Sequence, residues 1–244
     1  MAETAIQKKQ DESMQIAKAL DGAASNGLLA QKETSQFLKS FMLADSIDAL
    51  RNLLTPKVME RFMRLQNTTL GFKTDQPTGY PPEVVRECLI SAALQGVYPV
   101  GNQFNIIAGN CYITKEGMGQ LLKNIGMKYM ITPLATRFEP PMAKQPMEIV
   151  WEWNGKTHKQ VVEFQVRFTE NMAKAGVGVD AVIGKATRKA RAWLYLFITG
   201  LEVKEGDASE RQAIDITPPQ QEASPLEQKP AQADATDIPP MQKM

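Results

Sequence analysis

The chain is poor in the residues that hold metals or carry out redox and acid–base chemistry. Its 244 residues include one histidine and two cysteines. His158 therefore has no companions for a zinc site built from histidine and cysteine. We interpret Cys88 and Cys111 as small buried apolar side chains in preference to a redox pair. This composition leads us to expect no metal site and no cofactor.

Long apolar runs are also missing. No stretch approaches the ~20 apolar residues that span a bilayer, and the N-terminal string MAETAIQKKQDESMQ lacks the apolar centre of a secretory signal. The sequence therefore predicts a cytoplasmic protein with no membrane partner. Its 43% of apolar and 23% of charged residues are ordinary for a globular fold.

The glycine-rich string GVGVDAVIGKAT, residues 176–187, does not meet the requirements of a nucleotide-binding loop. A Walker-type loop has glycine five residues before its Gly-Lys pair, where this chain has Val179. Ala186 replaces the Ser or Thr that would hold magnesium, and Ala181 occupies the third glycine position of the dinucleotide fingerprint. The sequence also shows no nucleophile–base pair and no acid–base carboxylate pair. We expect no catalysis, and a nucleotide-dependent enzyme is the least favoured alternative.

The net charge of +1 conceals an asymmetry along the chain. Residues 201–244 contain nine acidic and four basic side chains, six prolines, six glutamines and no aromatic residue. Such a segment buries too little apolar surface to offset its ordering entropy, so the sequence predicts a disordered acidic tail over 201–244. Residues 1–200 carry the opposite sign, and a basic body with an acidic tail suits a nucleic-acid binder.

Periodicity and turn signals predict an α+β fold. Residues 1–30 are expected to be a mobile segment with a weak helix over 11–20 followed by a linker, and 31–200 to form the folded domain. Helices are predicted over 33–51, from Thr55-Pro56 to about Gln66, over 82–95, and over 115–126 behind Thr114 as N-cap. A closing helix is predicted over 178–200.

Two hairpins are predicted between these helices. In QFNIIAGNCYIT the turn is placed at Gly109-Asn110, with Ala108 opposite Cys111. In the second hairpin the turn is Asn154-Gly155, which places Trp153 beside Lys156 and Trp151 beside His158. With a strand over 127–138 that is interrupted at Pro133, the second hairpin forms an antiparallel three-strand meander.

The closing helix is amphipathic and carries the main candidate site. At about 100° per residue, one arc holds the apolar positions Val182, Ile183, Ala186, Ala190, Trp193, Leu194 and Phe197. The opposite side holds Lys185, Arg188 and Lys189, with Arg191 flanking them, and no acidic residue interrupts this basic face. Such a density of basic residues favours phosphate binding over a merely solvated face.

Further candidates lie outside this helix. Lys115, Arg137, Lys156 and Lys159 are second-rank phosphate contacts, and Asn105 and Tyr112 could contact sugar or phosphate from the first hairpin. Trp151 and Trp153 beside cationic side chains offer the combination that base stacking and backbone contact require. A purely structural role for both tryptophans is the favoured reading.

Two strings resemble the RecT family of phage recombinases, relatives of Redβ. LISAALQGVYPVGNQFNIIAGNCYITKEGMGQLL is similar to that family's helix, Q-x-G-L-x-P junction, hairpin and following helix, although the junction here, 95–99, is shortened. IGKATRKARAWLY resembles the family's basic helix, with Thr187 and Arg191 at the matching spacing and Ala186 in place of its lysine. The resemblance covers residues 50–200.

The resemblance implies an ATP-independent protein that binds single-stranded DNA and anneals complementary strands. It also implies a β-β-β-α core with DNA in a basic groove beside the hairpin, and a homo-oligomer in the form of a ring or filament. Expected partners are single-stranded DNA, the annealed duplex intermediate, a partner exonuclease and the host single-strand-binding protein. The alternative is a non-catalytic regulatory or assembly module whose basic helix docks an acidic protein partner.

Overall fold

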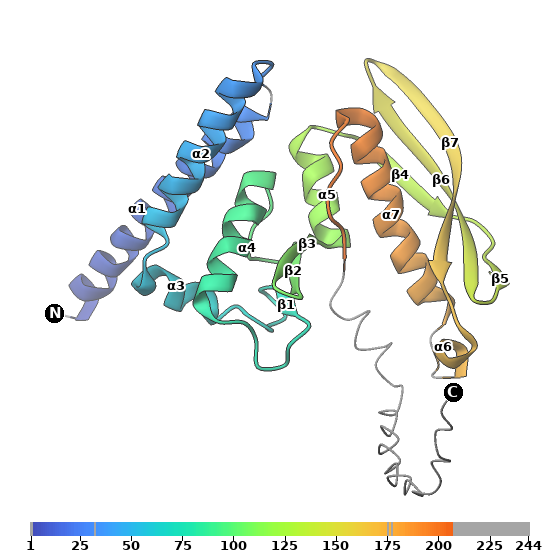
Figure 1. Cartoon of the computed structure of the whole chain (residues 1–244), viewed down its shortest axis with the longest axis horizontal. Helices are drawn as coiled ribbons and strands as arrows, with labels where there is room; N and C mark the ends of the chain where they lie inside the picture. Colours follow the sequence, from blue (N-terminus) through green and yellow to red (C-terminus); the bar gives the residue numbers. More distant parts are fainter. Residues whose placement is uncertain (1, 32, 175, 177, 207–244) are drawn as a thin grey trace, which may run out of the picture.

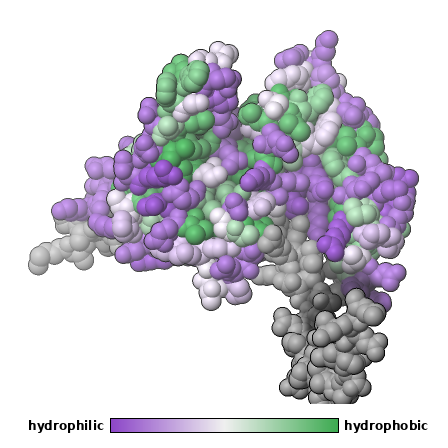
Figure 2. Space-filling model, in the orientation of Figure 1, coloured by the Kyte–Doolittle hydropathy of each residue, from purple (hydrophilic) through white to green (hydrophobic). Residues whose placement is uncertain are grey.

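The computed structural model of the chain describes residues 2–31, 33–174, 176 and 178–206. This part forms a helical arm (α1–α4) and a sheet arm (β4–β7, α6 and α7), joined by a small central sheet (β1–β3) and α5 (Figure 1). The ends of the two arms diverge and leave a notch, which is also visible in the space-filling view (Figure 2). The expected combination of helices with antiparallel hairpins is confirmed.

The helical arm contains the predicted helices with the predicted caps. It comprises α1 (Ala2–Ala30), α2 (Gln36–Leu53), α3 (Pro56–Met63) and α4 (Pro82–Gln95). The Thr55 side chain accepts a hydrogen bond from the Val58 amide, with Pro56 in the first turn. Gly96 ends α4 at φ +82°, a conformation that glycine adopts without strain.

The N-terminal segment differs from the expectation of a short helix and a linker. α1 is one continuous helix that packs against α2 and α4, and Ala24 and Ala30 are buried. A Cβ added at Gly27 would lie 2.2 Å from the Leu94 side chain, so the small residues of DGAASNG permit close contact between helices. Glycine and serine were read as loop signals because the sequence did not show this contact. Ala23 belongs to the same apolar core as Leu50 of α2 and Leu89 of α4.

The central sheet corrects the register of the first hairpin. It comprises β1 (Lys73–Thr74), β2 (Phe104–Ile107) and β3 (Asn110–Ile113), with Ile107 opposite Asn110. The turn is therefore Ala108-Gly109, at φ +50° and +73°, and not Gly109-Asn110. The pairing shifts by two residues, which preserves the faces because side chains alternate with a period of two.

A short C-terminal segment extends this sheet. The Ile113 amide donates to the Lys204 carbonyl at 2.9 Å, and the Gly206 amide donates to the Ile113 carbonyl at 3.0 Å. We call residues 201–206 the C-terminal strap; it runs beside the central sheet (Figure 1). The expectation of disorder over 201–244 is wrong for the strap. The rest of the predicted tail, 207–244, lies outside the described residues.

The sheet arm contains the predicted meander. β4 (Tyr129–Pro133) and β5 (Arg137–Glu139) both pair with one edge of β6 (Met142–Trp153), and β7 (Lys156–Arg167) pairs with the other edge. The interruption after Pro133 and the Asn154-Gly155 turn are as predicted. α5 (Lys115–Asn124) precedes this sheet, and α6 (Glu170–Lys174) and α7 (Val179–Thr199) follow it.

One apolar core connects both arms. It runs from Ala23 through Leu50, Phe104 and Ile149 to Leu194 and Tyr195. α7 packs against α5 on one side and against β4, β6 and β7 on the other. Within the described part of the chain, no helix has the length and apolar character needed to cross a membrane.

Candidate nucleic-acid interface

The apolar face of α7 fixes the helix in the sheet arm. Val182, Ala186, Ala190 and Leu194 follow one another every four residues and are at most 1% exposed. Trp193, on the edge of the same face, meets Trp151 of β6 with ring centroids 5.9 Å apart. α7 packs against β4, β6 and β7, so these buried members of the predicted apolar arc belong to the core of the sheet arm.

Arg188 does not present its charge to solvent, which corrects the predicted basic face. The residue is 7% exposed, and its Nε lies 3.3 Å from Glu205 Oε2 in the C-terminal strap. α7 is covered on this side by the strap, whose position the helical wheel could not show. Arg188 therefore joins the strap to α7 and is no surface contact for phosphate in this structure.

Arg191 is also engaged within the protein. Its Nη1 donates to the Lys115 carbonyl at 2.6 Å, and its guanidinium carbon lies 5.9 Å from the centre of the Tyr129 ring. A Cβ at Gly119 would lie 3.2 Å from this Nη1, so a glycine in α5 makes room for the guanidinium. Arg191 therefore connects α7 with α5 and β4, while the Lys115 ammonium pairs with Glu116.

Lys185 and Lys189 of α7 are partly exposed, as is Arg191. Lys189 forms no ion pair with another residue that the structure describes. The predicted set of four cations is therefore divided, with two lysines at the surface and two arginines holding the helix against its neighbours.

The second-rank cations divide in the same way. Arg137 pairs with Glu163, and Lys159 pairs with Glu148 across the β6–β7 ladder. Lys156 is exposed at the tip of the β6–β7 hairpin and has no ion-pair partner among the described residues. Of the four second-rank cations, Lys156 is therefore the one best placed to meet an external anion.

The two candidates on the first hairpin are not available as predicted. Asn105 is completely buried, and its Oδ1 accepts a hydrogen bond from the Lys73 amide, so the side chain holds β1 beside β2. Tyr112 is partly covered because a Cβ at Gly206 of the strap would lie 3.0 Å from its ring. The covering strands and strap come from distant parts of the chain, which explains why hairpin alternation alone missed them.

An aromatic cluster lies where α7 ends against the β6–β7 hairpin. We define the aromatic platform as Trp151, His158, Trp193 and Phe197. Trp193 and Phe197 are stacked, with centroids 5.3 Å apart and ring planes 17° from parallel. Trp151 is 4% exposed and lies edge-on to both rings, and His158 stacks on Trp151.

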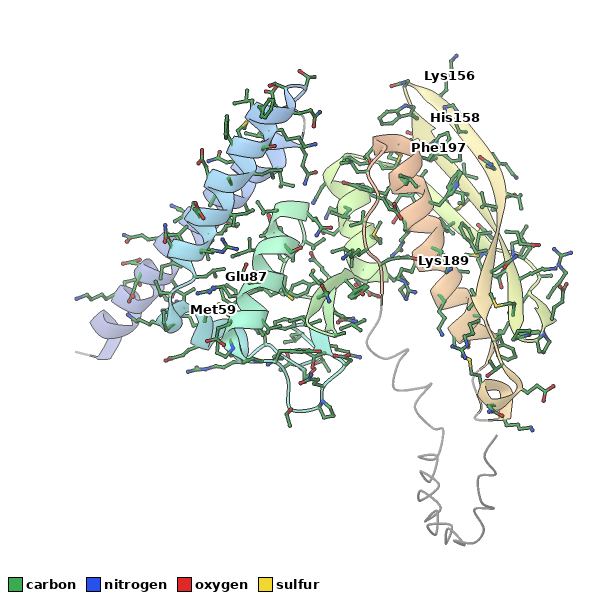
Figure 3. All side chains as sticks on the ribbon, in the orientation of Figure 1. Met59, Glu87, Lys156, His158, Lys189 and Phe197 are labelled. Carbon is green, nitrogen blue, oxygen red and sulfur yellow. The ribbon has the colours of Figure 1, made fainter. Side chains whose placement is uncertain are left out.

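The platform is accessible at one of its members. Phe197 is 58% exposed although two rings pack against it, and Trp153, two residues beyond Trp151, is 38% exposed. Lys156 lies beyond the platform at the hairpin tip, and Lys189 lies two turns before Phe197 on α7 (Figure 3). The predicted pairs Trp151–His158 and Trp153–Lys156 are confirmed, but Phe197 was assigned to the apolar arc and its exposure was missed. The four-residue spacing of Lys189, Trp193 and Phe197 was the signal that could have found it.

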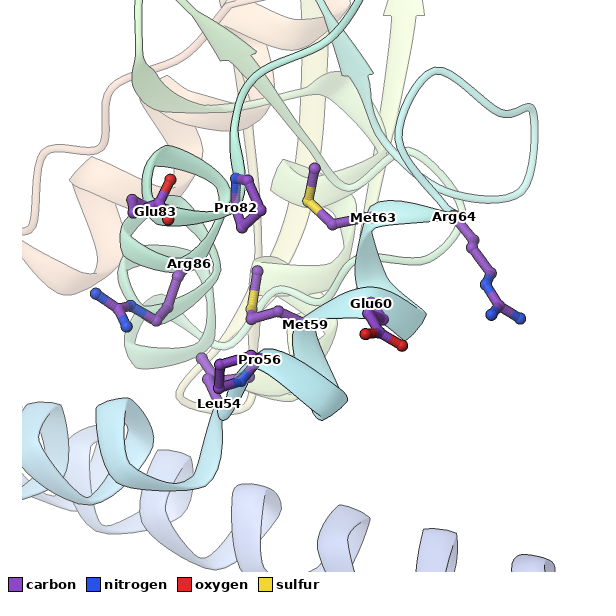
Figure 4. Close-up of a pocket in the computed structure, with 9 residues that line it drawn as sticks. All are labelled: Leu54, Pro56, Met59, Glu60, Met63, Arg64, Pro82, Glu83 and Arg86. Carbon is purple, nitrogen blue, oxygen red and sulfur yellow. The ribbon is translucent and has the colours of Figure 1, made fainter.

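Other hollows offer less to an anionic ligand. The notch between the arms contains a pocket of about 620 Å³, whose lining includes Gln31, Tyr98, Asn124 and Tyr195; none of the described residues that line it is charged. The expected basic groove is therefore not found in this part of the notch. A pocket of about 540 Å³ in the helical arm has Met59 and Met63 at its centre and Arg64 directed away from it (Figure 4).

The cysteines have no chemistry to offer at neutral pH. Burial raises the pKa of the Cys88 thiol to about 11 and also raises the pKa of Cys111. Cys88 is buried, as predicted, and Cys111 is partly buried. Among the described residues, no group of three or more His, Cys, Asp or Glu side chains is arranged to bind a metal ion.

Comparisons with known proteins assign no family. No protein-family model matches the chain, and no curated protein or solved structure is significantly similar to it.

Proposed function

We propose that this protein binds single-stranded DNA and anneals complementary strands without ATP, in homologous recombination of a phage or prophage. The observation that carries the proposal is one surface of the sheet arm, where the exposed Phe197 ring of the aromatic platform lies between the lysines Lys156 and Lys189. Following the resemblance to RecT proteins, the protein acts as a ring or filament of identical subunits. A partner exonuclease and the host single-strand-binding protein are its further partners.

The chemistry of this surface supports binding without sequence preference. Lysine ammonium groups attract the phosphates of any sequence, and aromatic rings stack on any base. Neither contact engages the hydrogen-bonding edge of a base, so these edges stay free for a complementary strand. Arg188 and Arg191 take part indirectly, because they hold α7 against the strap and α5.

The test is annealing of complementary oligonucleotides by the full chain in the absence of ATP. The double variant Lys156→Ala/Lys189→Ala removes the two surface cations that flank the platform. We expect slower annealing and a slope of log affinity against log salt that is smaller by about 1.4, because each lost phosphate contact removes about 0.7 on a single strand.

A matched control is the variant Lys39→Ala/Arg64→Ala, which removes the same charge from the helical arm. It should anneal like the wild type. Equal losses in both variants would show a general charge effect and count against this surface. If the wild type binds no single-stranded DNA at low salt, the proposed function is wrong, and the alternative of an acidic protein partner is favoured.

A further inference from the structure

One row of side chains along α7 combines two kinds of residue. Lys185, Lys189, Trp193 and Phe197 follow one another at intervals of four residues, which places them along one side of a helix. At a rise of 1.5 Å per residue the row is about 18 Å long. Its first half is cationic and its second half is aromatic.

The aromatic half is held rigidly. Trp193 and Phe197 stack on each other, and both lie edge-on to the buried Trp151, at 5.9 and 5.6 Å between centroids. These three rings come from β6 and two successive turns of α7, so the sheet supports the stacked pair, of which Phe197 is exposed. A ring already fixed by its neighbours loses little conformational freedom when a ligand stacks on it.

The exposed area on Phe197 lies between two lysines of the sheet arm. With 58% of its surface open, Phe197 offers a ring surface that Trp193 and Trp151 do not cover. Lys189 lies two turns before it, and Lys156 lies at the hairpin tip beyond it (Figure 3). A ligand that fits this arrangement has a flat apolar face and negative charges on both sides.

We propose that the platform is a stacking site for an unpaired nucleobase, with the face of the base on Phe197 and the flanking phosphates near Lys156 and Lys189. This inference rests on the proposed function and adds which ring of the platform takes the base and which two lysines take the flanking phosphates. A paired duplex hides the faces of its bases, so the site selects single strands. A stacked base keeps its pairing edge exposed, which allows annealing to begin on the protein.

The test compares two oligomers of equal length and charge, a thirty-residue oligothymidylate and a thirty-residue abasic backbone. We expect the full wild-type chain to bind the oligothymidylate more tightly and to lose tryptophan fluorescence on binding it. Phe197→Ala should lower the affinity for oligothymidylate by about 5- to 150-fold, the range for one stacked base, and leave the abasic affinity within about twofold. Phe197→Trp should restore the difference.

The matched control is Phe37→Ala, which removes an exposed phenylalanine, 80% accessible, from α2. It should bind both oligomers like the wild type. Equal wild-type affinity for both oligomers would overturn stacking and leave phosphate binding, and with it the proposed function, in place. An equal loss of affinity for both oligomers in Phe197→Ala would overturn it too, because the ring would then act through the fold. Binding of neither oligomer by the wild type would remove both proposals.

Discussion

Both arms expose apolar side chains at their ends, but the exposed rings of the two arms differ in the contacts that support them. Figure 2 shows apolar surface at the end of each arm. On the helical arm Leu29, Phe37 and Phe41 are 55%, 80% and 65% exposed, and on the sheet arm Phe197 is 58% exposed. No ring contact within the described chain involves Phe37 or Phe41, whereas Phe197 meets two tryptophans.

The difference shows what distinguishes a recognition surface from an apolar one. Exposed phenylalanines without supporting rings offer area for any apolar partner. Rings that are held in stacked geometry between lysines fix the orientation in which a flat, negatively charged ligand can bind. On this comparison the sheet arm, and not the helical arm, is the nucleic-acid interface that we propose.

The largest expected effect is on the free energy of unfolding and comes from removing the arginine of an Arg–Glu ion pair in each arm. The side chains of Arg188 and Glu205 are 9% and 23% exposed, whereas those of Arg51 and Glu87 are both 47% exposed. We expect Arg188→Ala to lower the free energy of unfolding by about 3 kcal/mol, because it leaves a largely buried carboxylate without its cation. Arg51→Ala should lower it far less, because water already solvates that pair.

Denaturant titration followed by circular dichroism measures both free energies. If Arg188→Ala keeps wild-type stability and loses affinity for DNA, its guanidinium acts as the phosphate contact that the sequence predicted, and our structural assignment of this residue is wrong.

The second effect is on affinity and comes from reversing charge on one arm at a time. Lys156→Glu/Lys189→Glu should weaken binding to single-stranded DNA roughly 100-fold at low salt, because attraction to phosphate becomes repulsion at two positions. Lys39→Glu/Arg64→Glu makes the same change in net charge on the helical arm and should weaken binding far less. Fluorescence anisotropy of a labelled oligonucleotide measures both affinities. Equal losses of affinity in the two variants would show that the sheet arm is not the preferred DNA site.

A third, smaller effect tests the apolar surface of the helical arm. Phe37→Ser/Phe41→Ser should change the free energy of unfolding by no more than about 0.5 kcal/mol per substitution, because both rings are exposed. Affinity for single-stranded DNA should stay within about twofold of the wild type. A larger drop in the same anisotropy assay would place the helical arm in the DNA site as well.

The smallest effect is a difference in acid sensitivity. In the helical arm, hydrogen bonds from Lys57, from the Ser35 amide and from Arg51 lower the pKa values of Glu12, Glu33 and Glu87 respectively. In the sheet arm, Lys144 lowers the pKa of Glu139 in the same way. A lowered pKa stabilises the fold above the usual carboxyl pKa of about 4.3, and that contribution is lost as the pH falls through the folded value.

Amide hydrogen exchange at pH 6 and pH 3.5, corrected for intrinsic rates, measures this difference arm by arm. Protection in α1, α2 and α4 should decrease slightly more than protection in β5 and β6. Equal decreases in both arms would show that these exposed carboxylates contribute nothing measurable, as for many surface ion pairs.

Local signals predicted much of the fold. The Asn154-Gly155 turn fixed the register of β6 and β7, and Thr55-Pro56 and Thr114 marked the starts of α3 and α5. Each of these signals acts within a few residues. The turn at Ala108-Gly109 was missed because alanine seldom adopts a positive φ, while Gly109-Asn110 offered a more ordinary turn.

The site was harder to predict because long-range packing decides which cations stay at the surface. Arg188 looked like a surface residue until the strap, which begins thirteen residues later, was found to cover it. Asn105 looked like the polar face of a hairpin until β1 was found to lie beside it. Helical and strand periodicity describe one element at a time, whereas Arg188 and Asn105 are buried because a second element packs over them.

The C-terminal strap has a practical consequence for shortening the chain. A truncation after Gly200 would remove the backbone partner of the Ile113 amide and the Glu205 carboxylate beside Arg188. A truncation after Gly206 would keep both. The position of a stop codon within these six residues therefore decides whether β3 and Arg188 keep their partners in the strap.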